Sequence, residues 1–125
     1  MHENDIARIV VDCAFHIHTR LGPGLLESVY EAVLKYELLK RGLTVATQQP
    51  MPVVWENVKL EIGFRADMIV GEKVVIEIKS VEAVAPVHPK QLRTYLRLMD
   101  LKLGLLINFN VPLIKDGITR VVNNL

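Results

Sequence analysis

The sequence predicts an α/β domain built on a mixed β-sheet with helices against it. Three observations lead to this prediction: two N-terminal stretches with helical spacing of apolar residues, a central run of short β-rich segments, and a third helical stretch followed by two more strands. The element order is roughly ααββββαββ. The chain of 125 residues is long enough to bury one core, and no linker or repeat divides it. We therefore expect residues 1–125 to form a single domain.

Two helices are predicted at the N-terminal end. The first covers residues 4–21, with Asn4 or Asp5 as the N-cap and Gly22-Pro23-Gly24 as its end. The second runs from about residue 25 to residue 41 and stops at Gly42. Its apolar residues expected to face the core are Leu26, Val29, Val33, Tyr36 and Leu39.

The rest of the chain predicts the sheet and one more helix. Residues 43–81 are β-rich, and prolines, glycines and Glu56-Asn57 divide them into three or four strands. Trp55 is expected to pack within this sheet. Pro86 and Pro89 introduce a helix that runs to about residue 101. A buried strand over residues 103–110 and a short strand over residues 118–123 complete the fold.

Charge and cysteine content limit the possible classes of protein. Fifteen basic and fourteen acidic residues leave a net charge of +1. Proteins that coat nucleic acid neutralise many phosphates, so this balance argues against that class, although it allows a local basic groove. The single cysteine, Cys13, leaves no internal disulfide and fits a reducing compartment. No secretory signal or membrane-length apolar segment is visible, and we expect a cytoplasmic protein.

The segment RADMIVGEKVVIEIKS, residues 65–80, places charged residues in strands that are otherwise apolar. Such residues are costly in half-buried strands unless they are paired or used. A three-residue turn over residues 71–73 would place Asp67 opposite Glu77, with Arg65 and Lys79 on the same face. The opposite face would then be wholly apolar: Ala66, Met68, Val70, Val74, Ile76 and Ile78. We prefer this register, because a two-residue turn would mix charged and apolar side chains on both faces.

Two interpretations of the charged face remain open. Adjacent carboxylates resist joint ionisation, and a divalent cation relieves this repulsion. Mg²⁺ and Mn²⁺ prefer such oxygen ligands, and they also accept a phosphate oxygen. The alternative is a ladder of surface ion pairs, in which Arg65 pairs with Asp67 and Glu77 pairs with Lys79.

The hairpin resembles the signature of the PD-(D/E)XK nuclease superfamily, which is an Asp on one strand and Glu-x-Lys on the next. Asp67 and Glu77-Ile78-Lys79 occupy these positions, while Ala66 stands where the signature usually has Pro. The segment GLLESVY, residues 24–30, matches the motif that names the small GxxExxY family, which is assigned to that superfamily. The likeness continues through HPKQLRTY and GLLINFNVPLIKDGI. It implies a restriction-endonuclease-like mixed sheet flanked by helices.

The resemblance also implies a set of site residues. Glu27 would join Asp67 and Glu77 around Mg²⁺ or Mn²⁺. Lys79 would orient or polarise the attacking water, or neutralise charge on the phosphoryl group. Gln91 and Tyr95 match a Gln-x-x-x-Tyr helix motif that supports the site and the substrate backbone in one branch of the superfamily. Further candidates for substrate binding are His88, Arg93 and Arg97.

The implied activity is metal-dependent hydrolysis of phosphodiester bonds in DNA or RNA. A second possibility is a nucleic-acid- or protein-binding module that keeps the nuclease fold without turnover. The weak net charge favours this module, whereas the complete set of carboxylates and lysine opposes it. A third possibility is a subunit whose partner supplies the substrate groove, and a homodimer would extend such a groove. No membrane association is expected.

Overall fold

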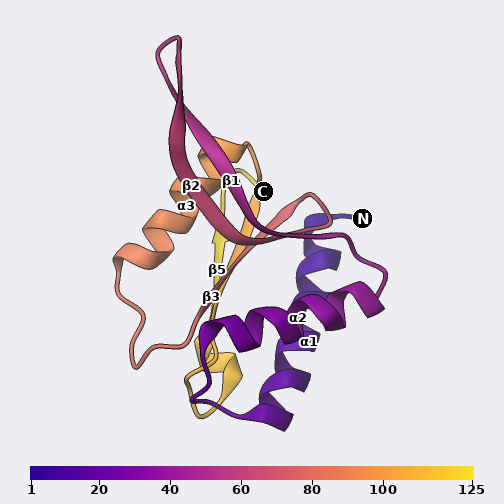
Figure 1. The fold of residues 1–125 in the computed structure, drawn as a ribbon. Helices are drawn as coiled ribbons and strands as arrows, with labels where there is room; N and C mark the ends of the chain where they lie inside the picture. Colours follow the sequence, from indigo (N-terminus) through magenta and orange to yellow (C-terminus); the bar gives the residue numbers. More distant parts are fainter.

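The computed structural model is a mixed five-stranded sheet with helices on both faces (Figure 1). It describes the backbone of residues 1–125 and the side chains of residues 1–60 and 63–125. The helices are α1 (Glu3–Leu21), α2 (Glu27–Lys40), α3 (Val87–Met99) and the short 3₁₀ helix η1 (Ile114–Gly117). The strands are β1 (Val45–Trp55), β2 (Val58–Val70), β3 (Val74–Lys79), β4 (Leu103–Asn108) and β5 (Ile118–Val122). The predicted fold class is confirmed, with three strands rather than four in the central region.

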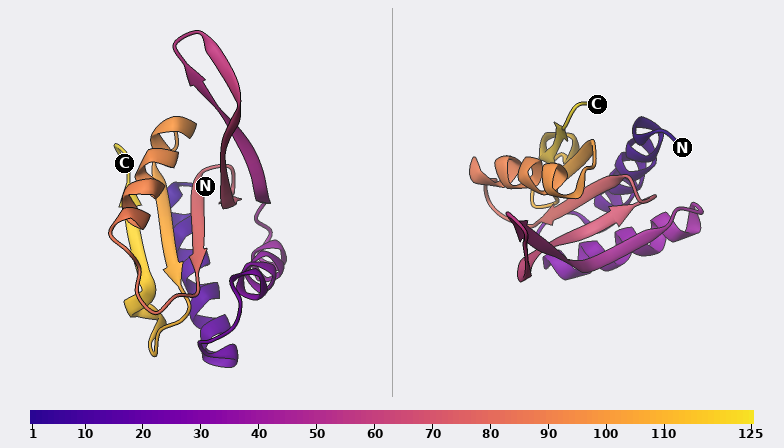
Figure 2. Two further views of the ribbon diagram at one scale, coloured as in Figure 1. Left: turned by 60° about the vertical axis from the view of Figure 1, so that its left-hand side comes forward. Right: turned by 90° about the horizontal axis from the view of Figure 1, so that it is seen from above.

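The strands lie in the sheet in the order in which they follow one another in the chain. Every neighbouring pair is antiparallel except β3 and β4, which are parallel and are connected through α3. A parallel pair requires such a crossover, and the crossover brings α3 onto one face of the sheet. Helices α1 and α2 cover the other face (Figure 2). No helix in the described chain is long and apolar enough to cross a membrane.

The β2–β3 hairpin has the predicted register. Val70 pairs with Val74 and Met68 with Ile76, across the three-residue turn. All six residues of the predicted apolar face are buried. Ala66 is nevertheless misassigned, because it contacts the core under α3, whereas Met68 contacts the core under α1 and α2. Strand β2 therefore changes face between these two residues, at Asp67.

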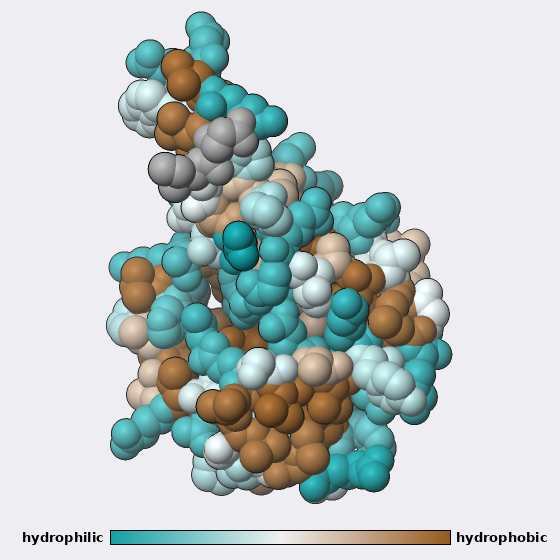
Figure 3. Space-filling model, viewed as in Figure 1, coloured by the Kyte–Doolittle hydropathy of each residue, from teal (hydrophilic) through white to brown (hydrophobic). Residues whose placement is uncertain are grey.

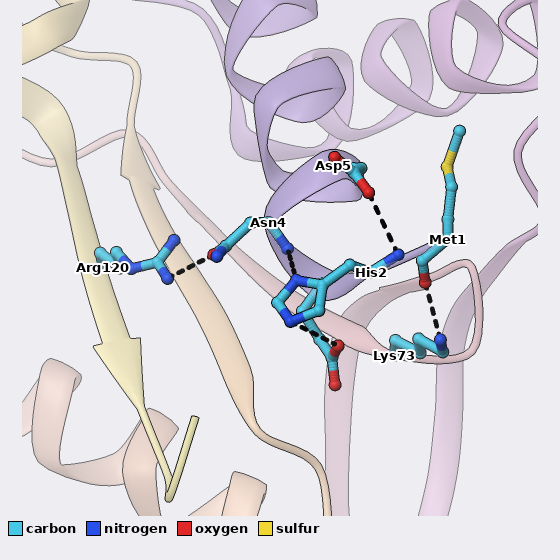
Figure 4. Close-up of polar contacts among 7 residues, drawn as sticks. Met1, His2, Asn4, Asp5, Lys73 and Arg120 are labelled. Carbon is cyan, nitrogen blue, oxygen red and sulfur yellow. Dashed lines mark hydrogen bonds and ion pairs between the residues drawn. The ribbon is translucent and has the colours of Figure 1, made fainter.

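The N-cap of α1 is His2, so the prediction of Asn4 or Asp5 is wrong (Figure 4). The N–H of Asn4 donates to Nδ1 of His2 at 2.9 Å, and the N–H of His2 donates to the Asp5 carboxylate at 3.3 Å. This reciprocal pair is a capping box, with a histidine ring in place of the usual hydroxyl. The cap explains why the helix begins one residue before Asn4.

Helix α2 turns a different face to the core than its sequence predicts. The buried residues are Tyr30, Leu34 and Leu38, whereas Leu26 is 74% exposed and Leu39 is 50% exposed. Tyr36 and Val29 are exposed as well, and Val33 is half-buried. Tyr30 fixes this orientation because its ring stacks on Phe109, with centroids 4.4 Å apart and an interplanar angle of 7°.

Strands β1 and β2 continue beyond the rest of the sheet as a projecting two-stranded ribbon (Figures 1 and 2). We call residues 50–65 of this ribbon the arm. Trp55 lies near its tip, at the turn into β2, and is 69% exposed. The prediction that Trp55 packs within the sheet is therefore wrong, because the strands next to β2 do not extend this far.

Candidate active site

The candidate site centres on Asp67 and Glu77, where β2 and β3 stop pairing through their backbones. The ladder between the strands ends at Met68 and Ile76. Beyond it, the N–H of Asp67 donates to Oε2 of Glu77 at 3.2 Å, and the N–H of Ile78 donates to Oδ2 of Asp67 at 2.8 Å. Each carboxylate thus accepts a hydrogen bond from the opposite strand. These bonds fix the positions of both side chains, as the register implied.

Glu77 is deeply buried for a carboxylate, with a relative exposure of 7%. Burial is the main reason that its pKa rises to about 8, and the hydrogen bond and charge of Asp67 add to the rise. The N–H of Asp67 and the charge of Lys79 act in the opposite direction. Because burial outweighs the opposing charge of Lys79, Glu77 holds a proton over much of the neutral range. An additional positive charge beside the two carboxylates would favour their joint ionisation near neutral pH.

Lys79 lies two residues beyond Glu77 on β3 and is half-buried. In a strand, residues two apart point to the same face, so the lysine belongs to the carboxylate side of the sheet. Among the described side chains, however, the ion pairs form elsewhere and include neither Glu77–Lys79 nor Arg65–Asp67. The structure therefore lacks the ion-pair ladder considered above.

Gln48 is a site residue that the sequence did not reveal. Its Nε2 donates to Oδ1 of Asp67 at 3.2 Å and to Oε1 of Glu31 at 3.1 Å. Its φ of 51° is left-handed, which costs a residue with a Cβ about 1 kcal/mol or more. Glu31 lies one helical turn after Glu27 on α2, and this spacing was the only signal in the sequence. The amide of Gln48 links α2 to Asp67.

Replacing Gln48 by glycine should separate its role in the site from its role in the fold. Glycine removes the amide but accepts the left-handed φ, so we expect the free energy of unfolding to change by less than about 1 kcal/mol. Metal affinity or cleavage should fall about 10- to 100-fold, as is typical when a partner of a metal ligand is lost. Denaturant unfolding and cleavage rates measure the two effects. Gln49→Gly is the matched control and should reduce stability alone; equal activity losses in both variants would contradict this role.

Glu27 contacts the end of β3 rather than the two carboxylates. Its Oε2 accepts a hydrogen bond from the N–H of Ser80 at 3.2 Å, and the Ser80 hydroxyl donates to the carbonyl of Leu25 at 2.6 Å. Among the described side chains, no group of three or more His, Cys, Asp or Glu residues is arranged to hold a metal ion. The structure thus brings Asp67 and Glu77 together and holds Glu27 beside the residue that follows Lys79.

Tyr30 orients the start of α2, and with it Glu27. The phenol donates to the carbonyl of Gly22 at 2.6 Å and accepts from the N–H of Leu25 at 3.2 Å. These bonds hold the loop that leads into the helix, while the ring is fixed on Phe109. The glutamate and tyrosine of GLLESVY are therefore coupled, because the tyrosine sets the position from which the glutamate projects.

Asn108 performs a similar task on the other side of Ser80. It is 2% exposed at the end of β4. Its Oδ1 accepts from the N–H groups of Val81 and Asn110 at 3.1 and 3.2 Å, and its Nδ2 donates to the carbonyl of Val81 at 2.9 Å. A single polar residue in the buried segment LGLLIN was the signal for this role. Asn108 thus fixes the backbone at Val81, directly after Ser80, whose N–H donates to Glu27.

Tyr95 of α3 reaches the carboxylate side of the molecule. Its ring stacks on Phe64, with centroids 4.2 Å apart, and Phe64 is a contact that the sequence analysis missed. Burial raises the pKa of the Tyr95 phenol, and the charges of Glu77 and Asp67 raise it further. The phenol therefore remains a hydrogen-bond donor near these carboxylates. Gln91 lies one turn earlier on the helix and is exposed.

The other candidates on α3 are Arg93, Arg97 and His88. Residues on an α-helix follow one another at about 100° around its axis, which puts Arg93 and Arg97 roughly opposite Gln91 and Tyr95. Both arginines are exposed. His88 is half-buried, and its Nδ1 is buried without a hydrogen-bond partner among the described residues. The helix thus brings Tyr95, but not the arginines, towards Glu77, and Gln91 lies on the same side of the helix as Tyr95.

Comparison with known proteins identifies the superfamily of the chain. A family model described as the PD-(D/E)XK nuclease superfamily matches residues 4–121. Searches of curated proteins and of solved structures gave no match. The match spans both helices that precede the sheet, the carboxylate hairpin and α3. The mixed sheet flanked by helices is consistent with the restriction-endonuclease-like fold expected from the motifs. The chain belongs to the PD-(D/E)XK nuclease superfamily.

Proposed function

We propose that this protein is a nuclease that hydrolyses phosphodiester bonds in DNA or RNA with Mg²⁺ or Mn²⁺. The carrying observation is the buried Glu77 held against Asp67, with Lys79 on the same face of β3. Membership of a nuclease superfamily supports this chemistry. The GLLESVY segment supports a place in the GxxExxY family, since its glutamate and tyrosine have linked structural roles.

The donor set of the site fits a divalent cation. Asp67 and Glu77 are hard oxygen donors, and the charge of Lys79 does not offset the burial and the repulsion that raise the pKa of Glu77. These two residues would hold the ion, and Glu27 would join them by giving up its hydrogen bond to Ser80. When bound, such an ion activates a water molecule as the nucleophile and stabilises negative charge in the transition state.

The chain's own residues would position the substrate and balance its charge. Lys79 would place a compact positive charge beside the phosphoryl group. Tyr95 keeps its proton and would donate a hydrogen bond to a phosphate oxygen, while the exposed amide of Gln91 would contact the substrate backbone one turn away. His88 is a further candidate for this contact. Gln48 and Asn108 would hold Asp67 and the Ser80 segment in place.

A cleavage assay over a panel of nucleic acids tests the proposal. Single- and double-stranded DNA and RNA, linear and circular, would be incubated with the protein in millimolar Mn²⁺ or Mg²⁺, and in EDTA. We expect cleavage that requires the metal. Binding without cleavage in any metal would favour the binding module, to which the weak net charge of +1 points.

Arg93 and Arg97 should contribute to substrate affinity rather than to the chemical step. Because they lie on α3 roughly opposite Tyr95, we propose that they contact phosphates away from the cleaved bond. Reversing both to glutamate should weaken binding and lower the slope of log K against log salt by roughly 0.7 to 0.9 per lost contact. The rate at saturating substrate should not change. Salt titrations of wild type, the double variant and the control Arg8→Glu measure this; an unchanged slope would identify a solvated surface.

A further inference from the structure

The arm exposes an apolar surface on one face of its ribbon. Strand pairing places Trp55 opposite Val58 and Val53 opposite Leu60, and cross-strand partners share a face. These four residues form what we call the arm face. Trp55, Val58 and Leu60 are 69%, 58% and 43% exposed. Figure 3 shows apolar side chains on the projecting ribbon. Val54 and Lys59 pair on the opposite face.

The charge of the arm favours a protein partner over nucleic acid. Residues 50–65 contain two acidic and two basic residues, Glu56, Glu61, Lys59 and Arg65. Affinity for nucleic acid comes largely from neutralising phosphates, and a ribbon without net positive charge supplies little of it. Apolar surface held away from the body of a protein is typical of a contact with another protein.

The edge of the arm does not favour pairing with an added strand. β1 is an edge strand of the sheet, and it contains Pro50 and Pro52. Proline has no N–H, so these two positions cannot donate to a further strand, and prolines on edge strands commonly prevent such pairing. A partner would therefore contact the arm through side chains rather than by extending the sheet.

A complementary hollow lies at the base of the same ribbon. It has a volume of about 360 Å³, within the range of pockets that hold small ligands. The six apolar residues that line it are Val45, Ala46, Met51, Ile69, Met99 and Leu101. Thr44, Gln49 and Glu72 complete the lining. We call it the basal pocket. The tip of the projecting arm lies away from the base of its own ribbon (Figure 1).

We propose that the chain forms a two-fold symmetric dimer, in which the arm face of each copy docks into the basal pocket of the other. The protruding surface and the pocket lie at opposite ends of one ribbon. When the ribbons of two copies lie side by side and point in opposite directions, the tip of each ribbon lies next to the base of the other. This holds for a ribbon of any length. Such a contact is isologous and closes on itself, so it ends at two copies. A second copy of the chain therefore covers both the arm face and the basal pocket in one arrangement.

The single tryptophan gives the proposal a direct measurement. Trp55 is the only tryptophan in the chain, so its fluorescence reports on the arm alone. With rising protein concentration we expect its emission to shift to shorter wavelength and its quenching by acrylamide to decrease. Sedimentation equilibrium over the same concentrations should show a monomer–dimer transition. A protein that remains monomeric up to about 1 mM, the limit of a weak association, would overturn the proposal.

Charge variants test the two surfaces separately. Trp55→Glu on the arm face and Thr44→Lys at the basal pocket should each weaken the dimer at least about 10-fold, because each places an unpaired charge against an apolar surface. Val54→Glu is the matched control, because Val54 is 62% exposed on the other face of the same arm, and it should not affect dimerisation. All three positions are exposed or at the rim of the pocket, and melting curves verify that each variant is folded.

Mixing the two disruptive variants gives the most specific outcome. The mixed dimer retains one native contact, and its other contact places the introduced glutamate against the introduced lysine. We expect the mixture to dimerise more tightly than either variant alone. A wild-type dimer unaffected by Trp55→Glu, or a mixture without recovery, would overturn this interface. Quenching of Trp55 by an oligonucleotide without any self-association would instead assign the arm to nucleic acid, and it would also overturn the proposal.

Discussion

Replacing Lys79 by alanine is expected to slow cleavage by about two to three orders of magnitude while Mn²⁺ binding is retained. Lys79 is half-buried on the face of β3 that carries Glu77, and its charge lowers the pKa of that carboxyl. A protonated amine cannot be a metal ligand, so its loss leaves the carboxylate donors intact. Removing one fixed positive group from a transition state typically costs about 10²- to 10³-fold in rate. Single-turnover cleavage and Mn²⁺ titration calorimetry measure the two effects independently.

Two further variants make the result specific to Lys79. Lys73→Ala removes a lysine from the turn at the other end of the hairpin, where its Nζ donates to the carbonyl of Met1 at 2.6 Å (Figure 4), and it should cut normally. Lys79→Arg restores the charge with a different shape and should recover only part of the rate. Cleavage by Lys79→Ala at the wild-type rate would remove the lysine from the mechanism. Loss of both cleavage and Mn²⁺ binding would assign it a structural role.

The proximity of the two carboxylates could be predicted because it follows from the register of the hairpin. Once the turn of the hairpin is fixed at three residues, the two-residue period of a strand sets which side chains face each other. Only the register that places Asp67 opposite Glu77 gives an apolar face for the core. What the period did not predict is the irregularity at Asp67 itself. Gln48, which contacts Asp67 there, lies on a different strand and has a left-handed backbone.

The errors arise where local pattern and tertiary contact disagree. Helix α2 has apolar residues around most of its circumference, so their periodicity did not identify the buried face. The stacking of Tyr30 on Phe109 determines which face is buried. Pro50 and Pro52 were interpreted as strand breaks, yet both lie within β1, because an edge strand tolerates a missing N–H. Ser80 and Asn108 act through backbone groups distant in sequence, and a single sequence contains little signal for such contacts.

The metal-free protein is expected to lose stability as the pH rises, and Glu77→Gln should remove this loss. The pKa of Glu77 is about 8 in the folded chain, against 4.5 for an ordinary glutamate. Between these values the folded state binds more protons than the unfolded state, so the free energy of unfolding falls with increasing pH. The slope approaches about 1.4 kcal/mol per pH unit. Glutamine keeps the shape of the side chain without the charge, so the variant should show a flatter profile and exceed wild type in stability near pH 8.

In the presence of a divalent metal, wild type should be more stable than Glu77→Gln near pH 8. This result would link the buried carboxyl to the proposed activity. A cation that binds only the folded protein stabilises it by RT ln(1 + [L]/Kd), or roughly 1.4 kcal/mol for about 10 mM Mg²⁺ and an assumed Kd of about 1 mM. The effect should be largest above pH 8 and fade on acidification, since a protonated carboxyl is a poor ligand. Glu77→Gln should lose the effect, while Glu82→Gln, a change at an exposed glutamate nearby, should keep it.

Melting curves of the three proteins across pH 5 to about 9, in EDTA, Mg²⁺, Mn²⁺ and a salt of matched ionic strength, separate the possible roles of Glu77. A metal site predicts that wild type gains stability from the divalent ions alone and that Glu77→Gln does not. If Glu77 has only a structural role, its protonated side chain stabilises the fold by accepting the hydrogen bond from the N–H of Asp67. In that case neither Mg²⁺ nor Mn²⁺ would change the melting temperature of wild type. This outcome would refute the metal site and the nuclease mechanism that depends on it.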